Sequence, residues 1–492
     1  KDRYLTPFPA IASSACRAVL LRAMVRAASV ASCLLAISRT DALLIQNNQS
    51  PEASGSLFTK PFRQQMKNHW DLQYVAEVSV GGQTVEGILD TGSFDLVVFS
   101  SSCLKCGQAA VYNEYQSKDV KKGERTRVQA YGSGSCTSDD LRDKVKIGEA
   151  VVQQQDMWVA KDCDMPLLAT AAFEAIVGIG PPGHLSRSAR NHLAEVEKLE
   201  ANYNMDGLDT PKSLEETKRL AQEDILDSYK KKELLVGLGV KTFSACFGRG
   251  SNTPGWLIWN DLTREGQPGV KQVPIEGVLT WGIKLGEVGL VDPSGAKSAL
   301  SCQTGCGAIV DTGTSLFAMP TDLYQSVFHS VNIYMNTRLP ADASPDCSDL
   351  SHFPDLVMEV GGQQLSFPPS SYIGSYVGQM NKEAEQFVRL SGLARSGCQL
   401  LIMDLGSSQV TQMGPMIILG MPFFREYYTT FDLGSGRGHR SIFVSRADDS
   451  CEPESDKKAG ASLRREEFRP RHVDLSKVRA PEWASRRTGI AI

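Results

Sequence analysis

The sequence ILDTGS at residues 88–93 returns as IVDTGT at residues 309–314. Each copy has an apolar pair, then Asp-Thr-Gly, then a hydroxyl residue. A single Asp-Thr-Gly is a commonplace turn, but two copies that share their apolar lead and their hydroxyl follower are far less expected by chance. The repeat therefore predicts two duplicated lobes that face each other, each with one acidic loop.

The chemistry predicted for this repeat centres on its two carboxylates, Asp90 and Asp311. The apolar residues before each Asp bury the incoming strand, and the glycine after it allows a tight turn and a close approach of another backbone. The hydroxyl residue that follows can donate a hydrogen bond to the carboxylate. Two carboxylates held in contact cannot both ionise cheaply, so the pair is expected to share one proton and to hold a water between them. Sequence does not assign the acid and the base, because such a pair titrates as a unit.

Other segments in the same order resemble the pepsin-like family, the two-lobed eukaryotic relatives of the retropepsins among the aspartic proteases. The second loop, GCGAIVDTGTSL at residues 305–316, is close to the family pattern throughout. YGSG at residues 131–134 resembles the tip of a β-hairpin flap that closes over substrate. AIVG at 175–178 and MIILG at 416–420 resemble the segments through which each catalytic strand is threaded, and YYTTFD at 427–432 resembles a closing strand. The resemblance covers about residues 72–446.

The resemblance implies an all-β fold, a bilobal pepsin-like double β-barrel or sandwich with a central active-site cleft. It implies an aspartic endopeptidase that acts on peptide or protein substrates without a cofactor or metal. The implied catalytic residues are Asp90 and Asp311. The implied substrate-binding and supporting residues are Gly92, Ser93, Tyr131, Gly132, Ser133, Gly313, Thr314 and Ser315.

The chain holds 12 Cys, which is high for a cytosolic enzyme and indicates disulfides. The C-x-x-C of Cys103 and Cys106 is read as a small disulfide loop, because no second C-x-x-C completes a zinc set. The family resemblance suggests Cys302 with Cys306 and Cys347 with Cys398. Weaker assignments pair Cys136 with Cys163, make Cys246 a buried free thiol and leave Cys451 unpaired.

Residues 184–241 are charged and helical in period, unlike the segments around them. Leu193, Val196, Leu199 and Tyr203 would form one apolar stripe, and Thr210-Pro211 is a typical helix start. We predict a helical insertion, read mainly as a solvated surface excursion and secondarily as a docking or specificity element for a protein partner.

The predicted organisation has five parts: a leader and signal peptide at 1–42, a short propeptide-like segment at 43–70, an N-terminal lobe at 71–265, a C-terminal lobe at 266–446, and a polar, disordered tail at 447–492. Within the leader, Met24 begins a basic stretch, the apolar run from Ala27 to Ile37 follows, and cleavage is expected after Ala42. This run is short of the roughly 20 residues that a membrane span needs. The chain is therefore expected in the secretory pathway, secreted or in an acidic vesicle, with no integral membrane span.

Composition excludes other classes of function. The net charge is −4 and no basic stripe is evident, which argues against nucleic-acid binding. The 7 His are scattered singly, without zinc-ligand spacing, and none has a recognisable triad context. GIGPPG at residues 178–183 formally matches a dinucleotide fingerprint, but its two prolines stand where a helix would have to open.

The first acidic loop departs from the family pattern at Phe94, Asp95 and Val97. Val97 replaces a Trp that supports the flap tyrosine in the family, and Asp95 adds a carboxylate near the pair. These departures motivate an alternative function, a catalytically weak or inactive pepsin fold used for binding or as a structural component. A further hypothesis is that Lys60, Arg63 or Lys67 pairs with the two Asp residues and holds a zymogen shut.

Overall fold

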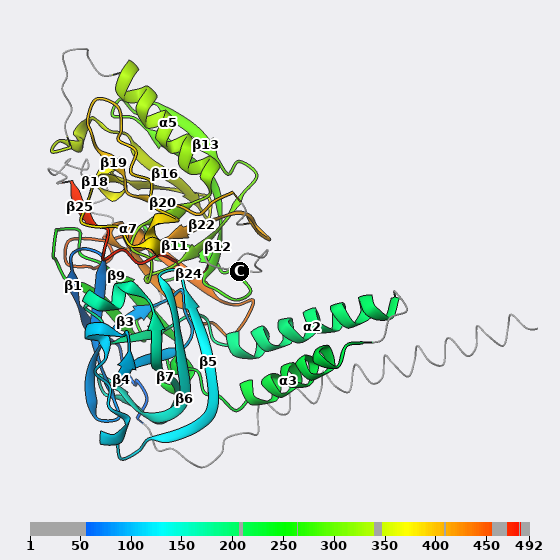
Figure 1. Cartoon of the computed structure of the whole chain (residues 1–492). Coiled ribbons are helices and arrows are strands. Elements are labelled where there is room, and N and C mark those ends of the chain that lie inside the picture. Colours follow the sequence, from blue (N-terminus) through cyan, green and yellow to red (C-terminus); the bar gives the residue numbers. More distant parts are fainter. Residues whose placement is uncertain are drawn as a thin grey trace, which may run out of the picture. The chain divides into compact units, whose positions relative to one another are not determined.

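The computed structural model describes residues 56–205, 210–262, 264–338, 347–407, 410–454, 470–481 and 483 (Figure 1). These residues belong to one compact unit, Gly55–Ile492. The predicted leader and signal peptide, residues 43–55 of the propeptide-like segment, and residues 455–469, 482 and 484–492 of the tail lie outside the described residues.

Strands dominate both halves of this unit, as predicted for an all-β bilobal fold. The elements of the first half are β1 (Phe62–His69), β2 (Gln73–Val80), β3 (Gln83–Asp90), β4 (Leu96–Leu104), β5 (Lys121–Tyr131), β6 (Gly134–Ile147), β7 (Ala150–Asp164), β8 (Ala175–Gly178), α2 (His184–Met205), α3 (Lys212–Ser228), α4 (Leu234–Gly237), β9 (Thr242–Cys246) and β10 (Gly255–Trp259).

The remaining elements form the second half and the described part of the tail. They are β11 (Lys271–Pro274), β12 (Gly282–Val291), β13 (Lys297–Ser301), β14 (Cys306–Val310), β15 (Phe317–Met319), α5 (Thr321–Thr337), β16 (Asp355–Val360), β17 (Gln363–Phe367), β18 (Ile373–Val377), α6 (Lys382–Glu385), β19 (Gln399–Leu400), β20 (Ile402–Asp404), β21 (Val410–Thr411), β22 (Gly414–Leu419), α7 (Met421–Glu426), β23 (Tyr427–Asp432), β24 (Ser441–Arg446) and β25 (Arg471–Asp474).

The two halves repeat one strand arrangement, as the duplicated loops predict. In the first half β3 lies parallel to β8, β4 lies antiparallel to β8, and β4 lies parallel to β7. In the second half β14 lies parallel to β22, β15 lies antiparallel to β22, and β15 lies parallel to β20. Each Asp-Thr-Gly loop thus follows a strand that pairs in parallel with one of the two apolar segments noted in the sequence. These segments are residues 175–178 in the first half and residues 416–419 in the second.

A two-residue glycine turn is also found at a similar place in each half. Gly81 and Gly82 join β2 to β3 with φ of 59° and 80°, and Gly361 and Gly362 join β16 to β17 with φ of 57° and 77°. Positive φ at both central residues matches the right-handed twist of a hairpin and is open to glycine without strain. The repeat therefore extends beyond the acidic loops.

A shared sheet links the two halves. Strand β1 pairs with β2 on one side and with β10 on the other, and the sheet continues through β9, β23, β24 and β11. Residues 62–69 of the predicted propeptide-like segment are therefore part of this sheet. In its core the rings of Phe243 and Phe431 stack at 4.7 Å, and the indole N–H of Trp281 donates to the carbonyl of Ile179 at 3.1 Å.

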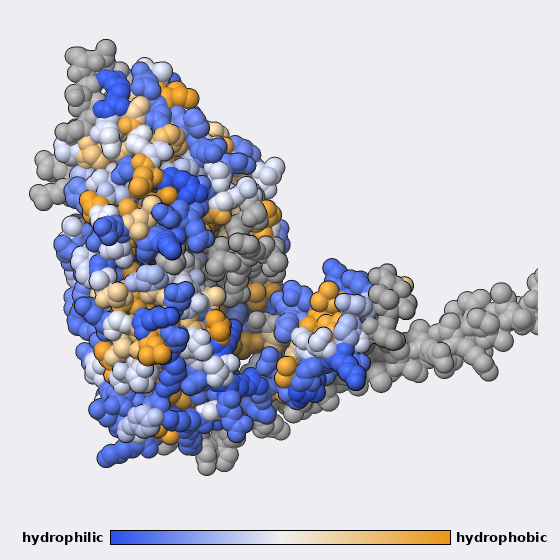
Figure 2. Space-filling view, in the orientation of Figure 1, coloured by the Kyte–Doolittle hydropathy of each residue, from blue (hydrophilic) through white to orange (hydrophobic). Residues whose placement is uncertain are grey.

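Helices α2 and α3 form the predicted insertion and lie side by side as a hairpin (Figure 1). Only part of the predicted apolar stripe is covered: Val196 is buried, whereas Leu199 is exposed. Figure 2 shows mostly hydrophilic residues on this hairpin, interrupted by apolar patches. Arg125 on β5 pairs with Asp224 at 3.1 Å and with Asp227, which fastens α3 to the first half.

The tail departs from the prediction of disorder where it is described. Residues 471–474 form β25, which lies parallel to β18 in the second half (Figure 1). Cys451, expected to be unpaired, forms a disulfide with Cys246, expected to be a free thiol. Both sulfur atoms are buried beside Ile258 and Tyr428, an environment that a sequence separation of 205 residues does not reveal.

Candidate active site

The two acidic loops are held by matching backbone contacts. Asp90 ends β3, and its side chain accepts a hydrogen bond from the amide of Gly92 at 2.9 Å. Asp311 follows β14, and its side chain accepts one from the amide of Gly313 at 2.7 Å. The amide of Asp311 donates to the carbonyl of Leu419, at the end of β22, at 2.9 Å. Each carboxylate is therefore aimed by its own loop.

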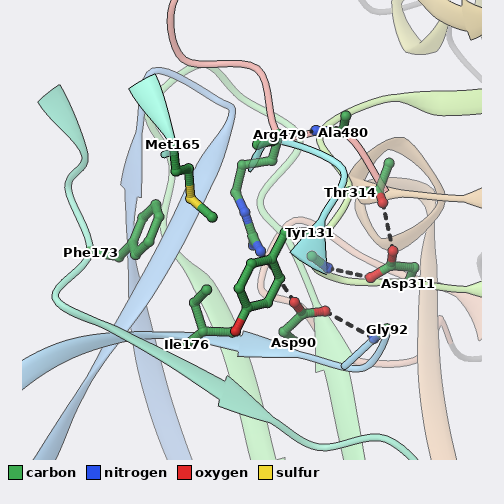
Figure 3. A pocket seen from close by; sticks show the side chains of 12 residues that line it. Asp90, Gly92, Tyr131, Met165, Phe173, Ile176, Asp311, Thr314, Arg479 and Ala480 are labelled. Carbon is green, nitrogen blue, oxygen red and sulfur yellow. Dashed lines mark hydrogen bonds and ion pairs between the residues drawn. The ribbon is translucent and has the colours of Figure 1, made fainter. Parts of the chain in front are cut away.

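The structure brings the two carboxylates together, as the repeat predicts. A Cβ atom added to Gly92 would lie 2.6 Å from Cγ of Asp311, and one added to Gly313 would lie 2.2 Å from Oδ1 of Asp90. Each glycine thus passes so close to the opposite carboxylate that a side chain would not fit. Both carboxylates are buried and line one cavity (Figure 3).

The hydroxyl residues that follow the loops behave differently in the two halves. The hydroxyl of Thr314 donates to Oδ2 of Asp311 at 2.6 Å, as predicted. The hydroxyl of Ser93 is buried and has no hydrogen-bond partner among the described residues. Oδ2 of Asp90 instead accepts a hydrogen bond from Nη2 of Arg479 at 3.2 Å.

The electrostatics favour a shared proton. Burial and the neighbouring Asp90 carboxylate raise the pKa of Asp311 above the range of an ordinary carboxyl. The Thr314 hydroxyl, the Gly313 amide and the Arg479 guanidinium oppose this shift without cancelling it. A carboxyl group with a raised pKa next to a second carboxylate is suited to hold a proton near neutral pH.

The predicted flap is the hairpin of β5 and β6. Tyr131 pairs with Gly134 across its tip, and both Tyr131 and Ser133 line the cavity that contains the two carboxylates. The ring of Tyr131 packs against the apolar cluster that includes Val97 and Trp158. Val97, which stands where the family has a supporting Trp, is itself fully buried in this cluster.

Of the other predicted site residues, Ser315 lies behind the cavity and supports backbone. Its hydroxyl donates to the carbonyl of Leu72 at 3.1 Å and accepts from the amide of Arg479 at 2.9 Å. Asp95 turns towards Arg127 at 3.5 Å and lines a different pocket, so it is not a third carboxylate in the cavity.

Sequence reasoning missed several residues of the cavity wall. They are Met165, Phe173, Ile176, Arg479 and Ala480. Ile176 belongs to a segment that was recognised for its role in threading the strand, and Met165 and Phe173 carry no motif. Arg479 and Ala480 come from the tail, which the sequence pattern assigned to disorder.

The hypothesis that Lys60, Arg63 or Lys67 holds the two Asp residues is not supported by the described contacts. Arg63 pairs with Glu452, and Lys67 pairs with Glu86. Both lie on β1, which pairs with β2 and β10, and neither residue lines the cavity. The guanidinium that reaches Asp90 comes from the opposite end of the chain.

Three of the predicted disulfides are present. Cys103 joins Cys106, Cys136 joins Cys163 and Cys302 joins Cys306. The bond between Cys136 and Cys163 ties β6 to β7, as proposed from the sequence, but it lies two residues from Gly134, near the tip of the flap and not at its base. The predicted pair of Cys347 and Cys398 is not among the disulfides of the described residues.

The described residues contain one sulfur cluster with metal-like spacing, formed by Cys103, Cys106 and Cys163. All three sulfurs are in disulfides and offer no thiolate. Within the described chain, none of the helices combines the length and the apolar character that a membrane crossing requires.

Comparison with known proteins agrees with this geometry. The chain is 26% identical to pepsin A of Canis lupus familiaris over 393 residues, which cover 78% of this chain and 86% of the pepsin. It is 24% identical to pepsin A of Bos taurus over 379 residues, or 76% of this chain and 85% of the relative. It is 24% identical to pepsin-2B of Gadus morhua over 375 residues, which cover 75% of this chain and 95% of the relative.

The two lobes share one strand order, and each contributes one acidic loop to the same cavity. This arrangement defines an aspartic-protease fold. The family model described as eukaryotic aspartyl protease matches residues 73–207 and 236–438. The chain therefore belongs to the eukaryotic aspartyl protease family, as its motifs indicated. The gap in the match, residues 208–235, falls within the helical insertion.

Proposed function

We propose that this protein is an aspartic endopeptidase in which Asp90 and Asp311 share one proton and activate a water for attack on a peptide carbonyl. The observation that carries the proposal is the meeting of the two loops, each glycine lying against the opposite carboxylate. One carboxylate takes a proton from the water as it attacks, and the other donates its proton to the carbonyl oxygen. Burial and the neighbouring Asp90 carboxylate raise the pKa of Asp311, which supports a pair that holds one shared proton.

Peptides and proteins are the proposed substrates, extended along the cleft between the lobes. The flap residues Tyr131 and Ser133 would exclude water and orient the chain. Phe173 and Ile176 give the cavity apolar walls, which favours apolar side chains next to the cleaved bond. The disulfides fit an oxidising compartment, so the secretory pathway is the proposed setting. A role of the helical insertion in binding a protein partner stays a prediction.

The test is cleavage of a peptide library between about pH 3 and about pH 7 by the full chain. Asp90→Asn and Asp311→Asn are each expected to abolish turnover, because either change removes the shared-proton arrangement. Both substitutions should also be made in an Arg479→Ala background, since Arg479 contacts Asp90 in this structure. Asp322→Asn, an exposed site on α5, is the matched control and should keep wild-type turnover.

The alternative is a pepsin fold that binds peptides without cleaving them. The departures from the family pattern at Phe94, Asp95 and Val97 are the features that favour it. Cleavage that is blocked by a statine-type inhibitor and lost in both Asp variants would exclude this alternative. Peptide binding without cleavage in every background would establish it.

A further inference from the structure

The described end of the chain lies in the cleft that the proposed function assigns to substrate. We propose that this C-terminal segment, residues 470–481 with Trp483, is a built-in inhibitor that occupies the peptide site and must leave before a substrate can enter. The inference rests on the proposed function of the cleft as a peptide site, and it concerns how access to that site is regulated.

The segment is anchored before it reaches the cavity. Strand β25 pairs with β18 in parallel, from Gly374 with Arg471 to Val377 with Asp474. The guanidinium of Arg471 pairs with Asp71 at 3.1 Å and donates to the carbonyl of Arg249 at 2.6 Å. A buried guanidinium is stabilised only when its donors are matched by acceptors, so these contacts specify one docked position.

Beyond the anchor, the backbone of the segment is hydrogen-bonded to both lobes. The amide of Arg479 donates to the hydroxyl of Ser315 at 2.9 Å, and the carbonyl of Arg479 accepts from the amide of Ser315 at 3.2 Å. The next amide, that of Ala480, donates to the hydroxyl of Ser133 on the flap at 3.1 Å. Hydrogen bonds to the main chain of an extended peptide are a common way of holding it in a groove, and here the chain supplies its own peptide.

The flap is closed on the segment. A Cβ atom added to Gly132 would lie 2.3 Å from the carbonyl oxygen of Pro481 and 2.6 Å from backbone atoms of Ala480. No room remains between the flap and the segment for a second polypeptide. A substrate can therefore reach the carboxylates only after the segment has been displaced.

Apolar side chains of the segment are buried with those of the second lobe. Val478, Ala480 and Trp483 belong to the cluster that contains Ile309 and Leu316. The indole of Trp483 is fully buried, and its N–H donates to the carbonyl of Gly92, inside the first acidic loop, at 2.9 Å. Burial of a large aromatic ring with its one donor satisfied is typical of an anchor residue at an interface.

Arg479 acts on the chemistry directly. Its guanidinium reaches from the segment towards Asp90, beside Tyr131 (Figure 3), and lies over the ring of Phe173 at 5.6 Å. The space left for the centres of water molecules in this cavity is about 10 Å³, about what one water needs. The segment thus removes both the room for a substrate and the free carboxylate oxygen.

The orphaned hydroxyl of Ser93 is a second sign that Asp90 is held in a blocked arrangement. In the other loop the equivalent hydroxyl, that of Thr314, donates to its own Asp. Ser93 has no such bond while Oδ2 of Asp90 accepts from Arg479. When the segment leaves, rotation of the Ser93 side chain can give Asp90 the donor that Asp311 already has.

The test uses the full chain with substitutions in the segment. A fluorescein-labelled synthetic peptide that copies residues 470–484 serves as the probe, and its binding is measured by fluorescence anisotropy. Wild-type protein should bind it weakly, because the tethered copy competes at a high effective concentration. The full chain with Arg479→Ala and Trp483→Ala should bind it with a dissociation constant lower by about tenfold or more, because the loss of a buried charge-assisted hydrogen bond and an aromatic anchor opens the cleft.

Ser476→Ala is the matched control, since the Ser476 hydroxyl contacts only Asp474 within the segment. It should bind the probe as wild type does. Arg479→Lys, which keeps the charge but loses the fork of donors, should be intermediate, and thermal unfolding of each variant checks that the fold is kept. The same proteins are assayed with an unrelated quenched peptide substrate, for which Arg479→Ala should raise kcat/KM by about tenfold or more.

The two readouts separate this inference from the proposed function. Increased probe binding without turnover in any variant would support the inhibitor segment and overturn the protease function. Equal turnover and equal probe binding in wild type, Arg479→Ala and the double variant would overturn the inhibitor segment while leaving the protease function standing.

Discussion

Thr91 and Thr312 exchange hydrogen bonds between the two acidic loops. The amide of Thr91 donates to the hydroxyl of Thr312 at 3.0 Å, and the amide of Thr312 donates to the hydroxyl of Thr91 at 2.9 Å. Each hydroxyl then donates onward to the opposite strand, that of Thr91 to the carbonyl of Val310 and that of Thr312 to the carbonyl of Leu89. The middle residue of each Asp-Thr-Gly thus fixes the distance between the two halves at the position of the carboxylates.

Replacement of Thr91 or Thr312 by Val should therefore weaken the junction. Either change leaves a buried amide and a buried carbonyl without partners, which we expect to lower the free energy of unfolding by about 2–4 kcal/mol. Urea unfolding measures the loss, and kcat should fall with it because the two carboxylates lose their spacing. Thr126→Val, at an exposed hydroxyl on β5 that bonds Asp139, is the control and should change stability by less than about 1 kcal/mol. A Thr312→Val variant as stable and as active as wild type would contradict the assigned role.

The raised pKa of Asp311, about 7 against an ordinary value of 3.8, predicts a pH-dependent stability. Between these values the folded protein holds a proton that the unfolded chain has lost, so stability falls as pH rises from about 4 to about 7. Asp311→Asn removes this titration. The variant should be similar to wild type at about pH 4 and more stable than wild type at about pH 7, by roughly 2–4 kcal/mol.

Urea midpoints of both proteins across that range measure the effect, with Asp322→Asn on the exposed face of α5 as the control. Wild type and Asp311→Asn should converge at the acid end and separate at the neutral end. Parallel pH profiles for the two proteins would show that Asp311 does not hold the proton.

Much of this architecture could be predicted because it repeats within the sequence. The Asp-Thr-Gly copies, the threaded apolar segments and the flap tip each have a local signature, and the pairing of β3 with β8 and of β14 with β22 follows from it. The helical insertion was also evident, since its period differs from that of the strands around it. A local sequence pattern is sufficient to predict structure where residues that are close along the chain determine it.

Contacts between distant segments could not be predicted in this way. The disulfide between Cys246 and Cys451 joins two cysteines that belong to no motif. The hydrogen bond from Arg479 to Asp90 joins residues that are 389 positions apart. The tail is polar in composition, but its few apolar residues, Val478, Ala480 and Trp483, fill a site that the lobes provide. The polar composition of the whole tail therefore gave no sign of this short segment, which is ordered by the surface on which it docks.

The long-range disulfide yields a stability prediction. Removal of the bond between Cys246 and Cys451 by paired Ala substitutions frees a loop of 205 residues in the unfolded chain. The loop-entropy model gives about 5 kcal/mol for a loop of this length and about 2 kcal/mol for a loop as short as that of Cys103 and Cys106. Thermal unfolding should therefore show a larger decrease for the Cys246 and Cys451 pair than for the Cys103 and Cys106 pair. Equal decreases would indicate that the unfolded chain is already held compact near Cys451.

The closeness of the two loops can be tested with a single methyl group. Gly313→Ala would place a Cβ 2.2 Å from Oδ1 of Asp90, and Gly92→Ala would place one 2.6 Å from Cγ of Asp311. Either methyl group must push the opposite carboxylate out of line, so kcat should fall by a factor on the order of 100 or more, as expected for a displacement of about 1 Å at a reacting group. Gly392→Ala is the matched control, because its Cβ would meet nothing nearer than 3.9 Å and its backbone requires no positive φ. Full activity in Gly313→Ala would mean that the carboxylates stand further apart in the working enzyme than they do here, and the shared proton would then have no physical basis.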